Sequence, residues 1–159
     1  MIKSEFKGEP YMSISICTYD EIINLLSNKK YDKFKFTNTY AIIYTDDAEI
    51  LFEINNGSIS DELAELAIDV LKNLDKCIKK AYNWLQHFNL KNDRWYSNAL
   101  EEGFELYGIY FGKYGYGHQQ KPLTDGFTIS FKTKNDYPCI FTVKFRENMQ
   151  PFAVEEWVN

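Results

Sequence analysis

Apolar and polar residues alternate along several stretches of the chain, and this alternation predicts strands. Residues 11–16, 127–132 and 139–146 place apolar side chains at every second position. Successive side chains of a strand point to opposite faces, so each stretch is expected to bury one face and expose the other. Two further runs, 104–111 and 152–157, are bounded by Gly or Pro and complete a C-terminal meander of four antiparallel strands, with a turn at Asn135-Asp136-Tyr137-Pro138.

The N-terminal part of the chain adds a short helix and a hairpin. Residues 20–26 suit a helix that begins at Thr18 or Asp20 as N-cap. Residues 40–44 and 49–54 are rich in β-branched and aromatic residues and are separated by Thr45-Asp46-Asp47. This arrangement predicts a hairpin with an acidic turn.

A helical period of three and four residues dominates the middle of the chain. It predicts one long amphipathic helix over residues 60–88, which begins at Ser58 or Ser60. Acidic residues stand in its first turns and lysines stand later, as the helix dipole favours. A second, short helix over residues 93–102 would end at Gly103. The apolar stripe of the long helix consists of Leu63, Leu66, Ala67, Val70, Leu71, Leu74, Cys77, Ile78, Ala81, Leu85 and Phe88.

These elements predict an α+β fold. An antiparallel sheet, made of the N-terminal hairpin and the C-terminal four-strand meander, would pack on one long central helix. The chain has 159 residues, of which 17% are aromatic, and contains only 4 Pro and 8 Gly with no linker-like tract. A single α+β domain covering residues 1–159, with one hydrophobic core, is therefore expected.

Charge and cysteine content narrow the classes of partner and site. Lys and Arg number 18 against 23 Asp and Glu, which gives a net charge of −5 and disfavours binding to nucleic acid. The same charge favours a basic protein partner. Cys17, Cys77 and Cys139 are widely spaced and form no CxxC, so they predict reduced thiols in a cytoplasmic protein and no zinc site. Cys77 and Cys139 fall in phase with apolar neighbours, as core residues do.

No apolar run approaches the length of a signal core or a membrane span, so no membrane association is expected. Catalytic signatures are absent as well. His87 and His118 are the only histidines, and neither lies in a metal-binding or nucleophile motif. We therefore assign no catalytic residue, no metal and no cofactor from the sequence, which favours a non-enzymatic protein over an enzyme. The sequence alone sets no oligomeric state.

The segment from Phe111 to Pro122 is the most distinctive local motif. Three glycines alternate there with Lys-Tyr and Tyr, so a pliable backbone presents Tyr114, Tyr116 and His118. Tyr/Gly loops of this composition resemble binding paratopes. The alternative is a long hairpin connection whose tyrosines pack on the edge of the sheet.

Two further aromatic segments lie beside acidic residues. Trp95-Tyr96 and Glu155-Glu156-Trp157 would suit a docking face for a basic protein, because aromatic side chains dominate binding hot spots and acids steer encounter. The alternative is that these rings complete the core against the long helix.

The apolar positions of four segments together form one pattern, in which Asn73-Leu74-Asp75 lies on the helical segment. The four segments are residues 48–54, 71–78, 104–110 and 126–131. This pattern extends over residues 40–157 and resembles families of small uncharacterised bacterial proteins, some of which are similar to the immunity partners encoded beside bacterial polymorphic toxins. Such partners are small, acidic, cytosolic and non-enzymatic. The resemblance thus implies an interaction protein, and it transfers no site residue.

The sequence therefore favours a bacterial protein-interaction module, with an immunity-type inhibitor of a basic toxin as its specific form. Two alternatives stay open. One is a small-molecule or peptide-binding domain whose Tyr/Gly loop lies over a pocket between helix and sheet. The other is an enzyme with an unfamiliar site near His118.

Overall fold

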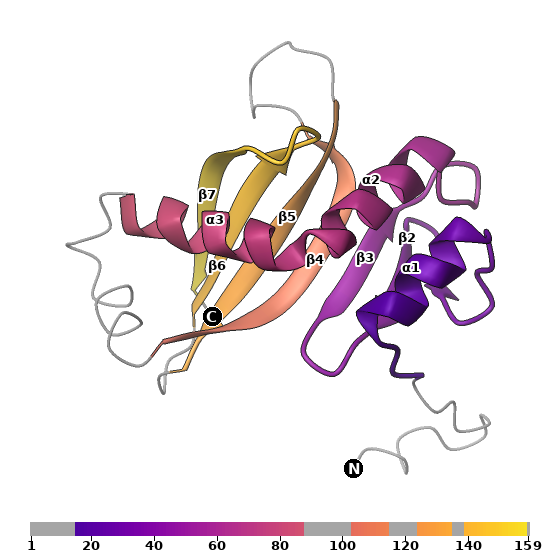
Figure 1. Ribbon diagram of the computed structural model, residues 1–159, viewed down its shortest axis with the longest axis horizontal. Helices are drawn as coiled ribbons and strands as arrows, with labels where there is room; N and C mark the ends of the chain where they lie inside the picture. Colours follow the sequence, from indigo (N-terminus) through magenta and orange to yellow (C-terminus); the bar gives the residue numbers. More distant parts are fainter. Residues whose placement is uncertain (1–14, 88–102, 115–123, 135–138, 159) are drawn as a thin grey trace.

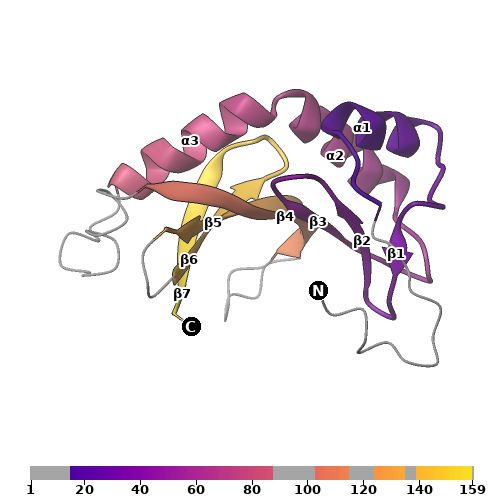
Figure 2. The same ribbon diagram turned by 90° about the horizontal axis from the view of Figure 1, so that it is seen from below.

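A seven-stranded sheet with helices on one of its faces forms the fold of the computed structural model (Figures 1 and 2). The structure describes residues 15–87, 103–114, 124–134 and 139–158. In chain order the elements are α1 (Tyr19–Ser27), β1 (Lys35–Phe36), β2 (Tyr40–Tyr44), β3 (Glu49–Glu53), α2 (Asp61–Lys72), α3 (Leu74–His87), β4 (Phe104–Tyr114), β5 (Thr124–Thr133), β6 (Cys139–Arg146) and β7 (Pro151–Val158). The expected α+β class and the dominance of antiparallel pairing are confirmed.

The strands lie in the sheet in the order in which they occur in the chain. Each neighbouring pair is antiparallel except β3 and β4, which run parallel with Ile50 opposite Ile109 and Phe52 opposite Phe111. A parallel pair cannot be joined by a tight turn, so the chain crosses over through α2 and α3 between these strands. The sheet is thus mixed rather than purely antiparallel, which corrects the sequence-based expectation.

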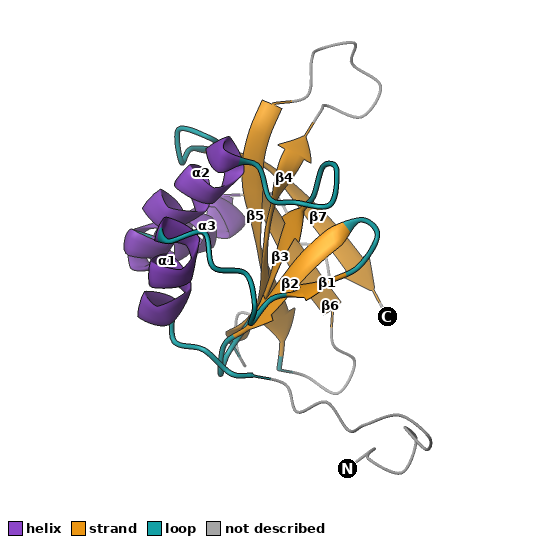
Figure 3. Ribbon diagram, turned by 90° about the vertical axis from the view of Figure 1, so that its right-hand side faces the viewer, coloured by secondary structure: helices purple, strands orange, loops and turns teal. Residues whose placement is uncertain are grey.

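The hydrophobic core lies between the helices and the face of the sheet that they cover (Figure 3). Alternate residues of β2 to β6 point to this face, and six of their phenylalanines are fully buried. All three cysteines are buried free thiols, as small core residues often are. Among the described residues no helix is long and apolar enough to cross a bilayer. The buried phenylalanines are Phe52, Phe111, Phe127, Phe131, Phe141 and Phe145.

The prediction of one long central helix is wrong, and so is the packing that depended on it. The helix breaks at Asn73, the C-cap of α2, where the backbone adopts φ −118° and ψ 25°. The side-chain amide of Asn73 donates to the carbonyl of Asp69 over 2.8 Å, and its own carbonyl accepts from the N–H of Cys77. An Asn side chain that bonds the backbone locally competes with helix continuation. The apolar stripe continues across the break, which is why periodicity did not reveal it.

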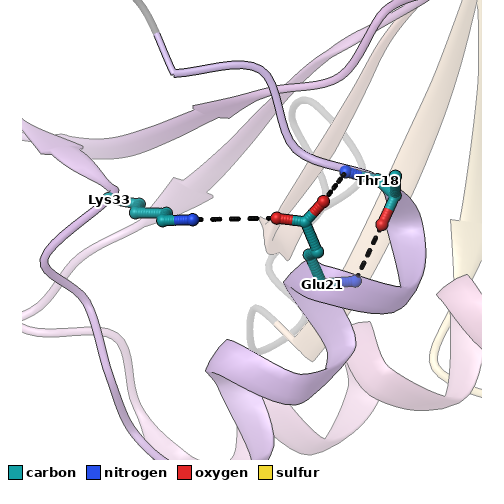
Figure 4. Close-up of polar contacts among 3 residues, drawn as sticks. All are labelled: Thr18, Glu21 and Lys33. Carbon is teal, nitrogen blue, oxygen red and sulfur yellow. Dashed lines mark hydrogen bonds and ion pairs between the residues drawn. The ribbon is translucent and has the colours of Figure 1, made fainter.

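Helix α1 begins with a capping box (Figure 4). The hydroxyl of Thr18 accepts from the N–H of Glu21 over 3.1 Å, and the carboxylate of Glu21 accepts from the N–H of Thr18 over 3.3 Å. The other oxygen of that carboxylate lies 3.7 Å from Nζ of Lys33. Of the two N-caps that the sequence offered, the structure uses Thr18, and in α2 it uses Ser60.

We expect Thr18→Ala to lower the free energy of unfolding by about 1 kcal/mol, because the N–H of Glu21 at the start of α1 loses the hydroxyl that accepts its hydrogen bond. Urea denaturation measures this loss. Thr18→Ser is the matched control, since it keeps the accepting oxygen and should stay close to wild type. Equal stability of all three proteins would show that the cap contributes nothing.

Several expected elements fall outside the described residues. These are residues 11–14 of the strand expected over 11–16, the short helix over 93–102 and the turn over 135–138. Of the expected N-terminal strand, Ile16 is described, and it forms an isolated bridge with Tyr44.

Candidate protein-binding surface

One face of the sheet carries no helix in the described part of the chain (Figures 2 and 3). We name it the uncovered face. Its side chains are those that alternate with the buried core residues along each strand. On β2 to β4 they are large apolar or aromatic side chains together with Glu49 and Glu53, and on β5 to β7 they are mainly polar. They include Tyr40, Ile42, Tyr44, Leu51, Glu53, Tyr110, Thr128, Ser130, Thr142, Lys144 and Glu155.

The aromatic half of the uncovered face is organised around Tyr40, Glu53 and Tyr110. Tyr40 stands opposite Glu53 in the β2–β3 register and is 39% exposed. The ring centroids of Tyr40 and Tyr110 are 5.9 Å apart, and the ring planes meet at 78°. The hydroxyl of Tyr110 donates to Oε2 of Glu53 over 3.3 Å. We call these three residues the tyrosine–glutamate cluster.

The polar half of the uncovered face is held by contacts between neighbouring strands. The hydroxyls of Ser130 and Thr142 are 2.8 Å apart, and the Lys144 ammonium forms an ion pair with Glu155. These contacts satisfy the polar groups within the sheet, as cross-strand pairs commonly do. Because these polar side chains already contact one another, the polar half has fewer groups available to contact a partner than the aromatic half has.

An acidic groove of about 400 Å³ lies at one end of the sheet, between α2, the start of β5 and the turn after β6. Glu62, Glu65 and Asp69 line it from α2 at helical spacing, so they share one side of that helix. Asp125 and Glu147 face them from the sheet and the turn. Leu66 and Asn148 complete the described lining, which contains no lysine or arginine.

Carboxylates that surround Asp125 make the electrostatic potential of this groove negative. Burial raises the pKa of its carboxyl, Lys113 opposes the rise, and the carboxylates of Glu147, Glu62 and Glu53 add to it. Glu53 belongs to the uncovered face and accepts from the N–H of Lys113, which pairs with Asp125 in the β4–β5 register, so Glu53 and the groove lie at the same end of the sheet. A cation placed there would relieve the repulsion.

Removal of the Asp125 charge should change the dependence of stability on pH. The folded-state pKa lies above the ordinary value of 3.8, so the native state binds more protons than the unfolded state and loses stability as pH rises through this window. We expect Asp125→Asn to be more stable than wild type at neutral pH and equally stable below pH 3.8, as measured by urea denaturation. A variant less stable than wild type at neutral pH would contradict this picture.

A second groove, of about 420 Å³, lies where α2 meets α3. The hydroxyl of Tyr19 donates to Oδ1 of Asp47 over 2.8 Å at its rim. Burial raises the pKa of Tyr19 to about 12, so its phenol stays protonated at neutral pH. Lys72 and Lys76 line the same groove with apolar residues of both helices. It differs from the acidic groove in that both signs of charge are present.

The structure describes only some of the residues that sequence reasoning selected. Trp95, Tyr96, Tyr116 and His118 lie outside the described residues. Tyr114 ends β4, where its backbone pairs with Thr124.

The acidic pair of β7 is divided between the two faces of the sheet. Glu155 lies on the uncovered face opposite Thr142, whereas Glu156 lies opposite buried Phe141 on the helix-covered face. The thiol of Cys139 donates to Oε1 of Glu156 over 3.6 Å. Trp157 stands opposite Ile140 in the register. Of this C-terminal segment, the structure places Glu155 on the uncovered face.

Sequence reasoning missed the tyrosine–glutamate cluster and the acidic groove. Their residues come from strands and turns that are far apart in the chain. A partial signal existed, because Tyr40 and Tyr44 occupy alternate positions of one predicted strand. The other partners follow only from the order of strands in the sheet.

No protein-family model matches this chain, and no curated protein or solved structure shows significant similarity to it. Among the described residues, no three His, Cys, Asp or Glu side chains converge closely enough to hold a metal ion. The carboxylates of the acidic groove are therefore spread along it rather than gathered at one point.

Proposed function

We propose that this protein is an interaction module that binds a basic protein partner across the uncovered face and the adjoining acidic groove. The observation that carries the proposal is the uncovered face itself. A sheet usually buries an apolar face against another layer. Here, within the described chain, the aromatic half of that face has no helix over it and keeps Tyr40 substantially exposed.

The charge of the partner follows from the acidic groove. Its five carboxylates come from α2, β5 and the turn after β6, at the end of the sheet where Glu53 also lies, and the whole chain carries a net charge of −5. Opposite charge on a partner accelerates encounter and suppresses wrong partners. Because the carboxylates are spread out, they suit several separated cations of a protein surface better than a single ion.

An immunity-type inhibitor is the specific form of this function that we favour. The apolar pattern around Asn73-Leu74-Asp75 supports it through the resemblance described above. Inhibition by an immunity protein requires only tight binding over a toxin surface, so no catalytic residue is needed. A broad face with an acidic end meets that requirement.

The test compares the proteins captured by wild type with those captured by a variant that carries a new charge on the uncovered face. Wild-type protein and Leu51→Lys are immobilised and exposed to a lysate of the source cells at low salt, and bound proteins are identified by mass spectrometry. Leu51→Lys adds a cation at the centre of the aromatic half and should lose a positively charged protein that wild type retains. The control Asn24→Lys adds the same charge on exposed α1 and should retain it.

The purified captured protein should then bind wild type at a single site, with an affinity that falls as salt rises. Retention of the same proteins by Leu51→Lys and wild type would contradict the proposal.

A small-molecule site in the groove between α2 and α3 is the second candidate. That groove combines the Tyr19 hydroxyl, charges of both signs and apolar side chains, as ligand sites do. A ligand that binds the native state raises the melting temperature by mass action. A thermal-shift screen should therefore find compounds whose effect disappears in Lys76→Ala, and a screen without such compounds counts against this candidate.

A further inference from the structure

We propose that the tyrosine–glutamate cluster is the binding site for a single cationic side chain, the ammonium of a lysine or the guanidinium of an arginine, on the partner. This inference rests on the proposed function, because it names the contact through which the uncovered face recognises a basic protein. It makes Tyr40, Tyr110 and Glu53 the residues that determine the chemistry of recognition.

The three side chains are brought together by the register of adjacent strands. Tyr40 stands directly opposite Glu53, while Tyr110 lies on the next strand opposite Leu51. The two ring planes meet at 78° in an edge-to-face contact, so the faces of the two rings point in different directions. The faces of aromatic rings carry negative potential and attract cations within about 6 Å of the centroid.

Glu53 supplies the negative charge of the tyrosine–glutamate cluster. Its Oε2 accepts from the hydroxyl of Tyr110 over 3.3 Å and from the N–H of Lys113 over 3.4 Å. An ionised carboxylate has about four acceptor positions, so these two long hydrogen bonds leave capacity for a further donor. An incoming ammonium or guanidinium would supply that donor.

Gly112 holds the ring of Tyr110 in place. A Cβ at position 112 would lie 2.6 Å from the hydroxyl oxygen of Tyr110 and 2.7 Å from its Cζ. The ring therefore lies across the bare backbone of Gly112, and any side chain there would displace it. Burial, followed by the nearby Glu53 and Tyr40, raises the pKa of Tyr110, so its phenol remains a neutral donor to Glu53.

The tyrosine–glutamate cluster favours the charged end of a lysine or arginine over an anion or a divalent metal ion. A single carboxylate with two aromatic faces repels anions and lacks the several oxygen ligands that a divalent metal requires. The side chain of Lys113 lies on the other face of β4 from Tyr110, because positions 110 and 113 are three residues apart. On that face, which the helices cover, Lys113 opposes the rise in the pKa of Asp125. The arrangement therefore fits the tip of a lysine or arginine that approaches from solvent.

The experiment is an NMR titration of the full chain with Nα-acetyl-lysine methylamide, with the uncharged Nα-acetyl-norleucine methylamide as the comparison probe. We expect the ε-methylene signal of the lysine probe to move upfield, because it lies over an aromatic ring. We also expect Tyr40→Ala and Glu53→Gln each to weaken its binding by about threefold or more. Gly112→Ala should weaken it as well, by displacing the ring of Tyr110.

Glu155→Gln is the matched control, because it removes a carboxylate from the same face outside the cluster and should leave binding of the probe unchanged. Circular dichroism verifies that each variant is folded, and Tyr110→Phe, which keeps the ring and removes its bond to Glu53, replaces any variant that is not. Equal binding of both probes, or equal binding by wild type and Tyr40→Ala, would overturn the inference.

The same titration separates this inference from the proposed function. If the lysine probe perturbs resonances of the acidic groove and none of the cluster, the inference fails while a basic partner remains supported. If the probe binds the cluster but no basic protein is captured, the inference stands and the proposed function fails.

Discussion

Replacing Phe127 with alanine is expected to lower the free energy of unfolding by about 3–5 kcal/mol, the largest loss of stability that we predict for one side chain. Phe127 is fully buried at the centre of the sheet. Its ring stacks on that of Phe145 at a centroid distance of 4.6 Å and lies 5.9 Å from that of Phe111. Truncation would leave a cavity between β4, β5 and β6 that neighbouring strands cannot close without shifting.

Urea denaturation of Phe127→Ala and Phe36→Ala provides the measurement and its control. Phe36 is 41% exposed, so the same truncation should cost much less there. Similar losses for the two variants would show that the row of phenylalanines is not the principal source of stability. A large loss for Phe127→Ala alone supports the position of the core between the sheet and its helices.

The second large effect is expected on binding rather than on stability. The triple variant Glu65→Gln/Asp125→Asn/Glu147→Gln removes three of the five carboxylates of the acidic groove. Each exposed or half-exposed ion pair with a basic partner contributes about 0.5–1 kcal/mol, so the affinity should fall by about 10- to 100-fold. The dependence of affinity on salt should weaken in parallel.

A second triple variant separates the local effect of the groove from net charge. Asp20→Asn/Asp32→Asn/Asp46→Asn removes three exposed carboxylates outside the groove and the uncovered face, so that both triple variants change the net charge from −5 to −2. Isothermal titration with the captured partner compares the two. The control should bind nearly as tightly as wild type, and equal weakening in both variants would show that only overall charge matters.

The strands of this fold could be predicted because apolar residues recur in the sequence at the positions that are buried in the structure. Along β6, the buried residues Cys139, Phe141, Val143 and Phe145 alternate with half-buried neighbours, and the same period stands in the sequence. Helix α1 was predictable for an equally local reason, since Thr18 and Glu21 form a capping box within four residues.

The features that escaped prediction depend on contacts between distant parts of the chain. The break at Asn73 follows from a side-chain bond to Asp69 that competes with the helix, while the apolar stripe continues undisturbed. The parallel pairing of β3 with β4 places Glu53 beside Tyr110, although 57 positions separate them. No local pattern specifies this neighbour, and the tyrosine–glutamate cluster therefore remained hidden.

The acidic groove escaped for the same reason. Helical spacing alone places Glu62, Glu65 and Asp69 on one side of α2, and such residues usually face only solvent. What makes them part of a groove is the approach of Asp125 and Glu147, which come from the other end of the chain. Charge counting predicts a basic partner, and the groove is where we propose that this partner binds.

The most direct test of the account is NMR mapping of the captured basic partner on the isotopically labelled full chain. We predict that partner binding perturbs resonances of β2, β3 and β4 on the uncovered face, together with those of Glu62, Glu65 and Asp125 at the acidic groove. Perturbations confined to α1 and α3, on the helix-covered side of the sheet, would contradict it.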